Sequence, residues 1–271
     1  MGGPILPRGF GLAAADYAKH RHGFPPSLLD RLADYEIGRP GQVVVDLGTG
    51  TGTLARQFAQ RSCASIGIDP DPRMLEAARQ LALEESIPIA AGEDPVVPGE
   101  VCFRQSTAEA TGLPSASADV VTAGQCWHWF DRRSAAREAS RLLRASGRLV
   151  VCHFDWIPLD GNLVEATEAL IRHHNSAWKL GGGHGMYPQW AREVREAGFF
   201  GLETFGFDVA SRYTPDGWRG RVRASAGITA LDADARDRFD RELGELLALQ
   251  FPGDHLEIDH RVWALIATRG P

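Results

Sequence analysis

The sequence has few cysteines, a deficit of positive charge and no hydrophobic run long enough to span a membrane. Its four cysteines show no C-x-x-C spacing, and its histidines are not joined by acids at ligand spacing, so we expect reduced thiols and no metal site. The formal net charge of −6 argues against binding to nucleic acid or to a membrane surface. The N-terminus lacks the charged start and apolar core of a secretory signal. These absences predict a cytoplasmic protein.

What is present is the composition of an ordinary globular chain, 44% hydrophobic and 24% charged. Its 271 residues suffice for one large α/β domain with additions, and we expect a single domain over 1–271. Apolar runs bounded by turn residues predict strands over 42–47, 64–69, 101–105, 118–124, 148–154, 199–209 and 260–268. Segments of helical spacing lie between most of these strands, which predicts an α/β fold.

Residues 43–54 carry the strongest indication of a ligand-binding site in the sequence. A run of valines typical of a buried parallel strand leads into Gly48, Gly50 and Gly52, and a helical segment follows. A strand, a glycine turn and a helix start bring backbone N–H groups and a positive helix end up to a ligand. Asp46 precedes the glycines, and Asp69 ends the next predicted strand, where a carboxylate can accept both hydroxyls of a ribose.

Together these residues closely resemble the class I S-adenosylmethionine (SAM)-dependent methyltransferases. The string Gln125-Cys-Trp-His-Trp-Phe-Asp131 resembles a motif of the type 11 subgroup that includes trans-aconitate methyltransferase-like enzymes. The resemblance implies a Rossmann-like, seven-stranded, mostly parallel sheet with an antiparallel seventh strand, helices on both faces, SAM as cofactor and S-adenosylhomocysteine (SAH) as product. A nicotinamide-linked oxidoreductase is the first alternative, but Thr53 stands where the third glycine of its pattern belongs. A non-catalytic SAM-binding protein is the second.

The resemblance also implies which residues contact SAM. They are Tyr17, Arg21, Asp46, Gly48, Thr49, Gly50, Asp69, Pro70, Met74, Thr107, Ala108, Glu109, Gln125 and Cys126. Tyr17 and Arg21 belong to an N-terminal helical segment, 10–36, that would fold over the cofactor; the alternative is a half-buried tyrosine and a solvated arginine. Thr107 departs from the family's usual aspartate, although its hydroxyl can still accept a hydrogen bond.

Aromatic and histidine side chains follow the fourth predicted strand, at the ligand edge of such sheets. We expect Trp127 and Trp156 near the substrate, although Trp127 could face the sheet instead. His128 and His153 are candidate general bases. The alternative for His128 is a structural histidine, and strand parity lets only one of His153 and Phe154 face the cleft.

Two stretches, 156–188 and 210–259, interrupt the strand–helix alternation, and we expect them to form a helical cap over the ligand edge. Arginines in the second stretch either form a solvated face or draw an acidic substrate; they are Arg212, Arg219, Arg221 and Arg223. An aromatic cleft under a cap suits a small-molecule acceptor. The resemblance at residues 125–131, together with the expected cap, implies methylation of a carboxylate or hydroxyl oxygen, with C- or N-methylation as the alternative, by a monomer or homodimer.

Overall fold

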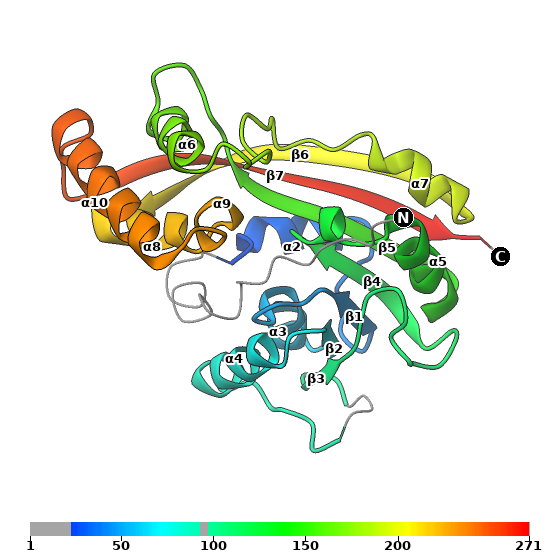
Figure 1. Ribbon diagram of the computed structural model, residues 1–271. Coiled ribbons are helices and arrows are strands. Elements are labelled where there is room, and N and C mark those ends of the chain that lie inside the picture. The colour runs from blue at the N-terminus through cyan, green and yellow to red at the C-terminus, as the bar shows by residue number, and fades with distance from the viewer. Residues whose placement is uncertain (1–22, 93–96, 271) are drawn as a thin grey trace.

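The computed structural model describes residues 23–92 and 97–270, which form a seven-stranded sheet in the order β3-β2-β1-β4-β5-β7-β6 (Figure 1). Every neighbouring pair is parallel except the two pairs that involve β7. This is the predicted Rossmann-like topology, with its antiparallel seventh strand. The strands are β1 (Val43–Leu47), β2 (Ala64–Asp69), β3 (Val101–Gln105), β4 (Ala118–Gly124), β5 (Leu143–Trp156), β6 (Phe199–Tyr213) and β7 (Leu256–Arg269).

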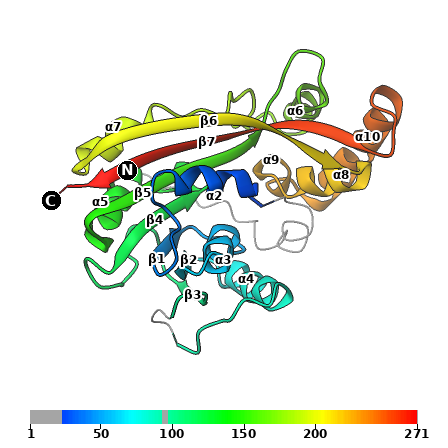
Figure 2. The same ribbon diagram turned by 180° about the vertical axis from the view of Figure 1, so that it is seen from behind.

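Helices cover both faces of the sheet, as the continuous apolar runs of its central strands require. One face packs against α2 (Pro26–Ala33), α3 (Thr53–Gln60) and α4 (Pro72–Glu84). The other packs against α5 (Arg132–Leu142) and α7 (Trp190–Glu196). Figure 2 shows α2 lying along the sheet on the first face. Alternation along the strands divides the core, so that Val44 packs with α2 while Val45 packs on the opposite face.

The remaining helices gather at one end of the three long strands β5, β6 and β7 (Figures 1 and 2). They are α6 (Leu163–His174), α8 (Pro215–Arg223), α9 (Ala226–Thr229) and α10 (Ala233–Gln250), and we call them the cap. The cap has a hydrophobic core of its own, which includes Trp218, Phe239 and Leu243, all fully buried. Side chains capping the helix N-termini explain where several cap helices begin: Asn162 accepts from Glu165 N, Thr214 from Gly217 N and Asp232 from Ala235 N.

The long strands exceed their predicted bounds, and this is the main correction to the sequence-based fold. β5 begins at Leu143 and ends at Trp156, β6 continues to Tyr213, and β7 begins at Leu256. Within the first expected cap stretch, 156–188, helix α6 ends at His174. Tyr187, near the end of the first expected cap stretch, packs on Trp190 and Trp263 against the sheet. Among the described helices, none has the length and apolar character needed to cross a membrane.

Candidate active site

The glycine bend after β1 is shaped by close contacts as well as by backbone conformation. Gly48 has φ +62°, and a Cβ added there would lie 2.9 Å from both Cys126 Sγ and Phe130 Cζ. Gly50 has φ +56° and faces Met74, whose Cε would lie 3.4 Å from an added Cβ. The bend is pinned to the neighbouring strand, because Thr49 N donates to Ile68 O at 2.9 Å. Only glycine at position 48 leaves both the turn and the neighbouring side chains undisturbed.

Asp46 lies at the end of β1, almost completely buried, with both carboxylate oxygens engaged. The hydroxyls of Thr49 and Thr122 each donate to it at 2.6 Å. Burial raises the pKa of Asp46 to about 6, and the two hydroxyl donors only partly offset that effect. A carboxylate held in this way is ready to receive a cationic group, since the arriving positive charge would favour its ionised form.

Asp69 ends β2 beside the bend and is held by backbone donors. Gly50 N donates to its Oδ2 and Asp71 N to its Oδ1, each at 2.9 Å. Burial raises the pKa of Asp69 and outweighs these two hydrogen bonds. Each carboxylate oxygen can accept more than one hydrogen bond, so the outward lone pairs can accept from a diol. Asp71 in turn caps α4 by accepting from Arg73 N.

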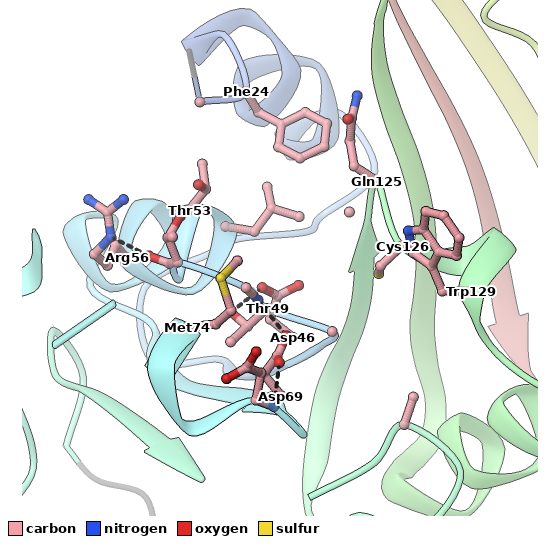
Figure 3. Close-up of a pocket in the computed structure, with 18 of the residues that line it drawn as sticks. Phe24, Asp46, Thr49, Thr53, Arg56, Asp69, Met74, Gln125, Cys126 and Trp129 are labelled. Carbon is pink, nitrogen blue, oxygen red and sulfur yellow. Dashed lines mark hydrogen bonds between the residues drawn. The ribbon is translucent and has the colours of Figure 1, made fainter. Parts of the chain in front are cut away.

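A cavity of about 1190 Å³ opens over the bend and continues to the cap. Figure 3 shows Asp46, Asp69 and Met74 in its lower part and Gln125, Cys126 and Trp129 along one side. All of the predicted cofactor residues that the structure describes line it: Asp46, Gly48, Thr49, Gly50, Asp69, Pro70, Met74, Thr107, Ala108, Glu109, Gln125 and Cys126. Tyr17 and Arg21 fall outside the described residues. The structure thus brings one predicted set of residues from four separate strand ends into one cavity.

Gln125 and Cys126, which follow β4, are each held in place by hydrogen bonds to neighbouring strands. Gln125 has a left-handed backbone, with φ +60°, and its amide donates to Phe154 O and, at 3.3 Å, to Asp155 Oδ1. The hydroxyl of Tyr187 donates to Asp155 Oδ2 at 2.7 Å. Burial raises the pKa of Tyr187, and the neighbouring Asp155 raises it further, so this hydroxyl keeps its proton. A chain of hydrogen bonds therefore runs from the far face of the sheet to the cavity wall.

Four side chains predicted for the acceptor end do not line the cavity. Trp127 is fully buried in the core below the sheet, because the short helix η2 (Trp127–Trp129) turns it away while Trp129 faces the cavity. His153 is buried on the face opposite Phe154, with Nδ1 3.2 Å from Asp155 Oδ2. His128 stacks between Trp129 and His153 and does not reach the cavity. Trp156 lies in the cap core, where its Nε1 donates to Glu168.

The structure instead places residues at the acceptor end that sequence reasoning did not assign to the site. Phe154, Tyr213, Arg221 and His260 line the part of the cavity next to the cap, and Phe24, which precedes α2, also lines the cavity. Of the histidines in the described ranges, His260 alone lines the cavity. Two features of the sequence indicated residues of this kind. Strand alternation allows only one of His153 and Phe154 to face the cleft, and the second cap stretch contains arginines that could draw an acidic substrate.

The family comparison agrees with this geometry. A model described as "Methyltransferase domain" matches residues 45–151, which run from β1 into β5 and include the bend and both acids. Residues 45–151 therefore form the part of the chain that matches a methyltransferase domain. An uncharacterized methyltransferase of Mycobacterium tuberculosis is 34% identical over 140 residues, which cover 52% of this chain and 49% of that one. The chain thus matches only about half the length of that relative.

Solved structures share the methyltransferase fold. YcgJ of Bacillus subtilis has a TM-score of 0.54 at 21% identity, covering 90% of this chain and 98% of that one. Phosphoethanolamine N-methyltransferase 2 of Haemonchus contortus, in complex with phosphomonomethylethanolamine and SAH, has a TM-score of 0.56 at 18% identity, covering 96% of this chain and 58% of that one. The predicted resemblance to methyltransferases is confirmed over residues 45–151, and the fold is confirmed by the solved structures; the trans-aconitate-like subgroup stays a prediction.

The residues of the methyltransferase domain fit SAM better than a dinucleotide. A dinucleotide would place its negatively charged pyrophosphate at the glycine bend, beside the buried carboxylate of Asp46. SAM is cationic at its amino group and sulfur and neutral at its ribose, which matches one buried acid and one acid at a strand end. Asp46 would hold the amino-acid end, Asp69 the ribose, and Met74 and Ala108 would pack on the adenine.

Proposed function

We propose that the protein methylates an oxygen atom, of a carboxylate or a hydroxyl, on a small-molecule acceptor. The choice of oxygen rests on the resemblance at residues 125–131. The observation that supports a small second ligand is that the cavity does not end at the bend but continues to a wall of Phe154, Tyr213 and His260 below the cap. Its volume of about 1190 Å³ exceeds the roughly 300–1,000 Å³ of typical single-ligand pockets. It therefore has room for a nucleoside donor and a small second molecule together.

Bound SAM would supply a methyl group on a sulfonium sulfur. The sulfur leaves as the neutral thioether of SAH, so the leaving group needs no further activation. The remaining tasks of the protein are alignment and exclusion of water. Gln125 and Cys126 stand between the two ends of the cavity, held by Asp155 and by the Leu47 carbonyl, to which Cys126 Sγ donates at 3.1 Å. Phe24, Trp129 and Phe130 surround the opening with apolar surface. This arrangement supports a direct transfer between two molecules bound side by side.

The kind of oxygen decides whether the protein has to move a proton. A carboxylate reacts in its ionised form and needs no base, whereas an aliphatic hydroxyl has to lose its proton. His260 is suitably placed for the second case, because it lines the acceptor end. Its Nδ1 lies 3.0 Å from Ile258 O, so in the neutral ring Nδ1 carries the proton and Nε2 is an acceptor. His128 and His153 could act only through intervening groups.

The test has two stages. Calorimetry should show binding of SAM and SAH and none of NADH, and Asp69→Asn should weaken SAM binding. A panel of small carboxylic acids, phenols, aliphatic alcohols and amines is then incubated with SAM, and the site of the new methyl group is determined by mass spectrometry and alkaline hydrolysis of esters. Methyl esters or ethers support the proposal. A methyl group found only on nitrogen or carbon, or NADH binding in place of SAM, overturns it.

A further inference from the structure

The outer edge of β6 is open and regular over most of its length. Within the described residues β6 is the last strand of the sheet and pairs only with β7 (Figure 2). Its register with β7 is unbroken from Glu203 to Tyr213, because the one irregularity lies between Phe200 and Glu203. An edge of this kind presents a row of backbone N–H and C=O groups to any strand that approaches it. We propose that a second copy of this chain pairs with this edge, β6 against β6, in an antiparallel twofold dimer.

The sequence of this segment lacks three of the features that commonly protect an edge strand. Such strands are often interrupted by a bulge or carry proline or lysine. Residues 203–213 contain no proline and no lysine, and the irregularity precedes them. From Thr204 to Ser211 the one charged side chain is Asp208, and Arg261 donates to both of its carboxylate oxygens, at 2.6 and 2.7 Å. The edge is therefore nearly neutral, so two copies of a chain with net charge −6 can meet there.

One side of the edge is apolar, and it is the side on which α2 packs. Phe205, Phe207 and Val209 all pack on the core of that face and are only partly buried. The rings of Phe205 and Phe207 lie nearly parallel, with centroids 6.1 Å apart. A second strand at this edge would gain backbone hydrogen bonds and would also cover these side chains. A partly exposed apolar stripe beside an open edge is thus better explained by a paired strand than by solvent.

Twofold symmetry limits the registers that two β6 strands can adopt. An axis perpendicular to the sheet keeps each side chain on its own face, so the pairing is centred on a residue and not between two residues. A centre at Phe207 places this ring opposite its counterpart and places Phe205 opposite Val209. Aromatic and β-branched pairs of this kind stabilise antiparallel strands. A centre at Asp208 would place like charges opposite each other, which is unfavourable.

The other face of the strand fits the same register. Thr204, Gly206 and Ala210 are small and exposed on this face. A centre at Phe207 places Thr204 opposite Ala210 and Gly206 opposite Asp208. Because Gly206 has no side chain, it leaves room for the ion pair that Asp208 of the other copy makes with Arg261. Both faces therefore favour one register, which pairs residues 203–211 of each copy.

Cross-linking tests this register directly. The four cysteines of the chain are buried, so an added thiol on β6 should react first. Residues opposite each other have Cβ atoms about 4.5–5.5 Å apart, so Phe207→Cys should give a covalent dimer on oxidation with copper phenanthroline after a small adjustment of the strands. Phe205→Cys is the matched control. Position 205 in the two copies is offset by about 13 Å along the strands, too far for a disulfide.

Opposite charges at the centre separate a loss of pairing from a loss of folding. In sedimentation velocity the wild type should form a dimer that dissociates on dilution. Phe207→Glu and Phe207→Lys should each be monomeric, because like charges would face each other across the axis, and an equimolar mixture of the two should recover the dimer. Leu249→Glu adds the same charge on α10, where Leu249 is 82% exposed, and should dimerise like the wild type.

Four results would overturn the pairing of β6 with β6. They are a wild-type chain that is monomeric at every concentration, a dimer that survives both Phe207 substitutions, a mixture of the two variants that stays monomeric, and disulfide formation that is equal at positions 205 and 207. A monomer that binds an extended peptide at β6 would assign the edge to a strand from another protein instead. These measurements use neither SAM nor an acceptor, so their outcome is independent of the proposed function.

Discussion

Replacing Asp46 with asparagine should stabilise the SAM-free protein at neutral pH and weaken its binding of SAM. Asp46 is buried between two hydroxyl donors, and its pKa is raised from 3.8 to about 6. At pH 7.5 Asp46 is ionised in both states, and its charge is less stable in the buried folded site than in the unfolded chain. A rise of two pKa units corresponds to about 3 kcal/mol of destabilisation once the group is ionised in both states. Asparagine has nearly the same shape and carries no charge.

The sign of the pH dependence follows from the direction of the shift. A group whose folded pKa lies above its unfolded pKa stabilises the folded state at low pH, and this contribution is lost as pH rises through the folded value. The difference in unfolding free energy between Asp46→Asn and wild type should thus be small near pH 4, grow between pH 4 and 6, and level off at up to about 3 kcal/mol in favour of the variant. Asp208→Asn is the control of opposite sign, because Arg261 lowers the pKa of Asp208.

Binding of SAM should respond in the opposite direction. In the proposed complex the amino group of SAM interacts with the ionised form of Asp46, so the variant should bind SAM about 10- to 100-fold more weakly, the range of hydrogen bonds between charged groups. For the same reason, wild-type affinity should fall as pH drops below 6, with release of a proton on binding. Urea denaturation from pH 4 to 8 measures the first effect, and calorimetry in buffers of different ionisation enthalpy measures the second. A variant that is less stable than wild type at pH 7.5 and binds SAM equally well would refute the reasoning.

Two further substitutions test the bend and the support behind it. Gly48→Ala should lose about 2–5 kcal/mol of stability, from a strained positive φ and a clash with Cys126 and Phe130, and it should lose SAM binding. Gly41→Ala is the control, because Gly41 has φ +87° but no atom lies within 4 Å of the added Cβ. Its loss of stability in thermal denaturation measures the cost of the positive φ without the clash. Tyr187→Phe should lose about 1–2 kcal/mol in urea denaturation, because the bond to Asp155 disappears while stacking on Trp190 remains; unchanged stability would show that this bond contributes nothing.

The cofactor half of the site was predictable because its signals are local. A valine run, three glycines at alternate positions and an acid at the end of the next strand specify a strand, a turn and a strand end without reference to the rest of the chain. Asp46 and Asp69 then meet because parallel strands end at one edge of a sheet. The predicted strand bounds were accurate for β2, β3 and β4 for the same reason: both ends of each are marked by turns or polar residues.

The aromatic residues after β4 show that the sequence predicts where such side chains gather but not which way each one points. Two tryptophans and a phenylalanine follow a strand end at the edge of the sheet where the cavity lies, yet the single turn of η2 directs Trp127 into the core and Trp129 into the cavity. Which side chain turns which way depends on a turn of three residues. Similarly, parity showed that only one of His153 and Phe154 could face the cleft, but choosing between them required the position of α7, whose Trp190 lies against His153.

The acceptor end depends on an arrangement that no local pattern encodes. Tyr213 and His260 lie on parts of β6 and β7 that extend toward the cap, where Leu256 and Ile258 alternate with exposed residues and pack into the cap core. Without the cap, the apolar side chains of Leu256 and Ile258 would have no partner surface. The cap and the strand extensions therefore form one unit, and its Tyr213 and His260 line the same cavity as the glycine bend. It follows that selectivity for the acceptor can change through this unit while the glycine bend and its two acids, and with them the binding of SAM, remain as they are.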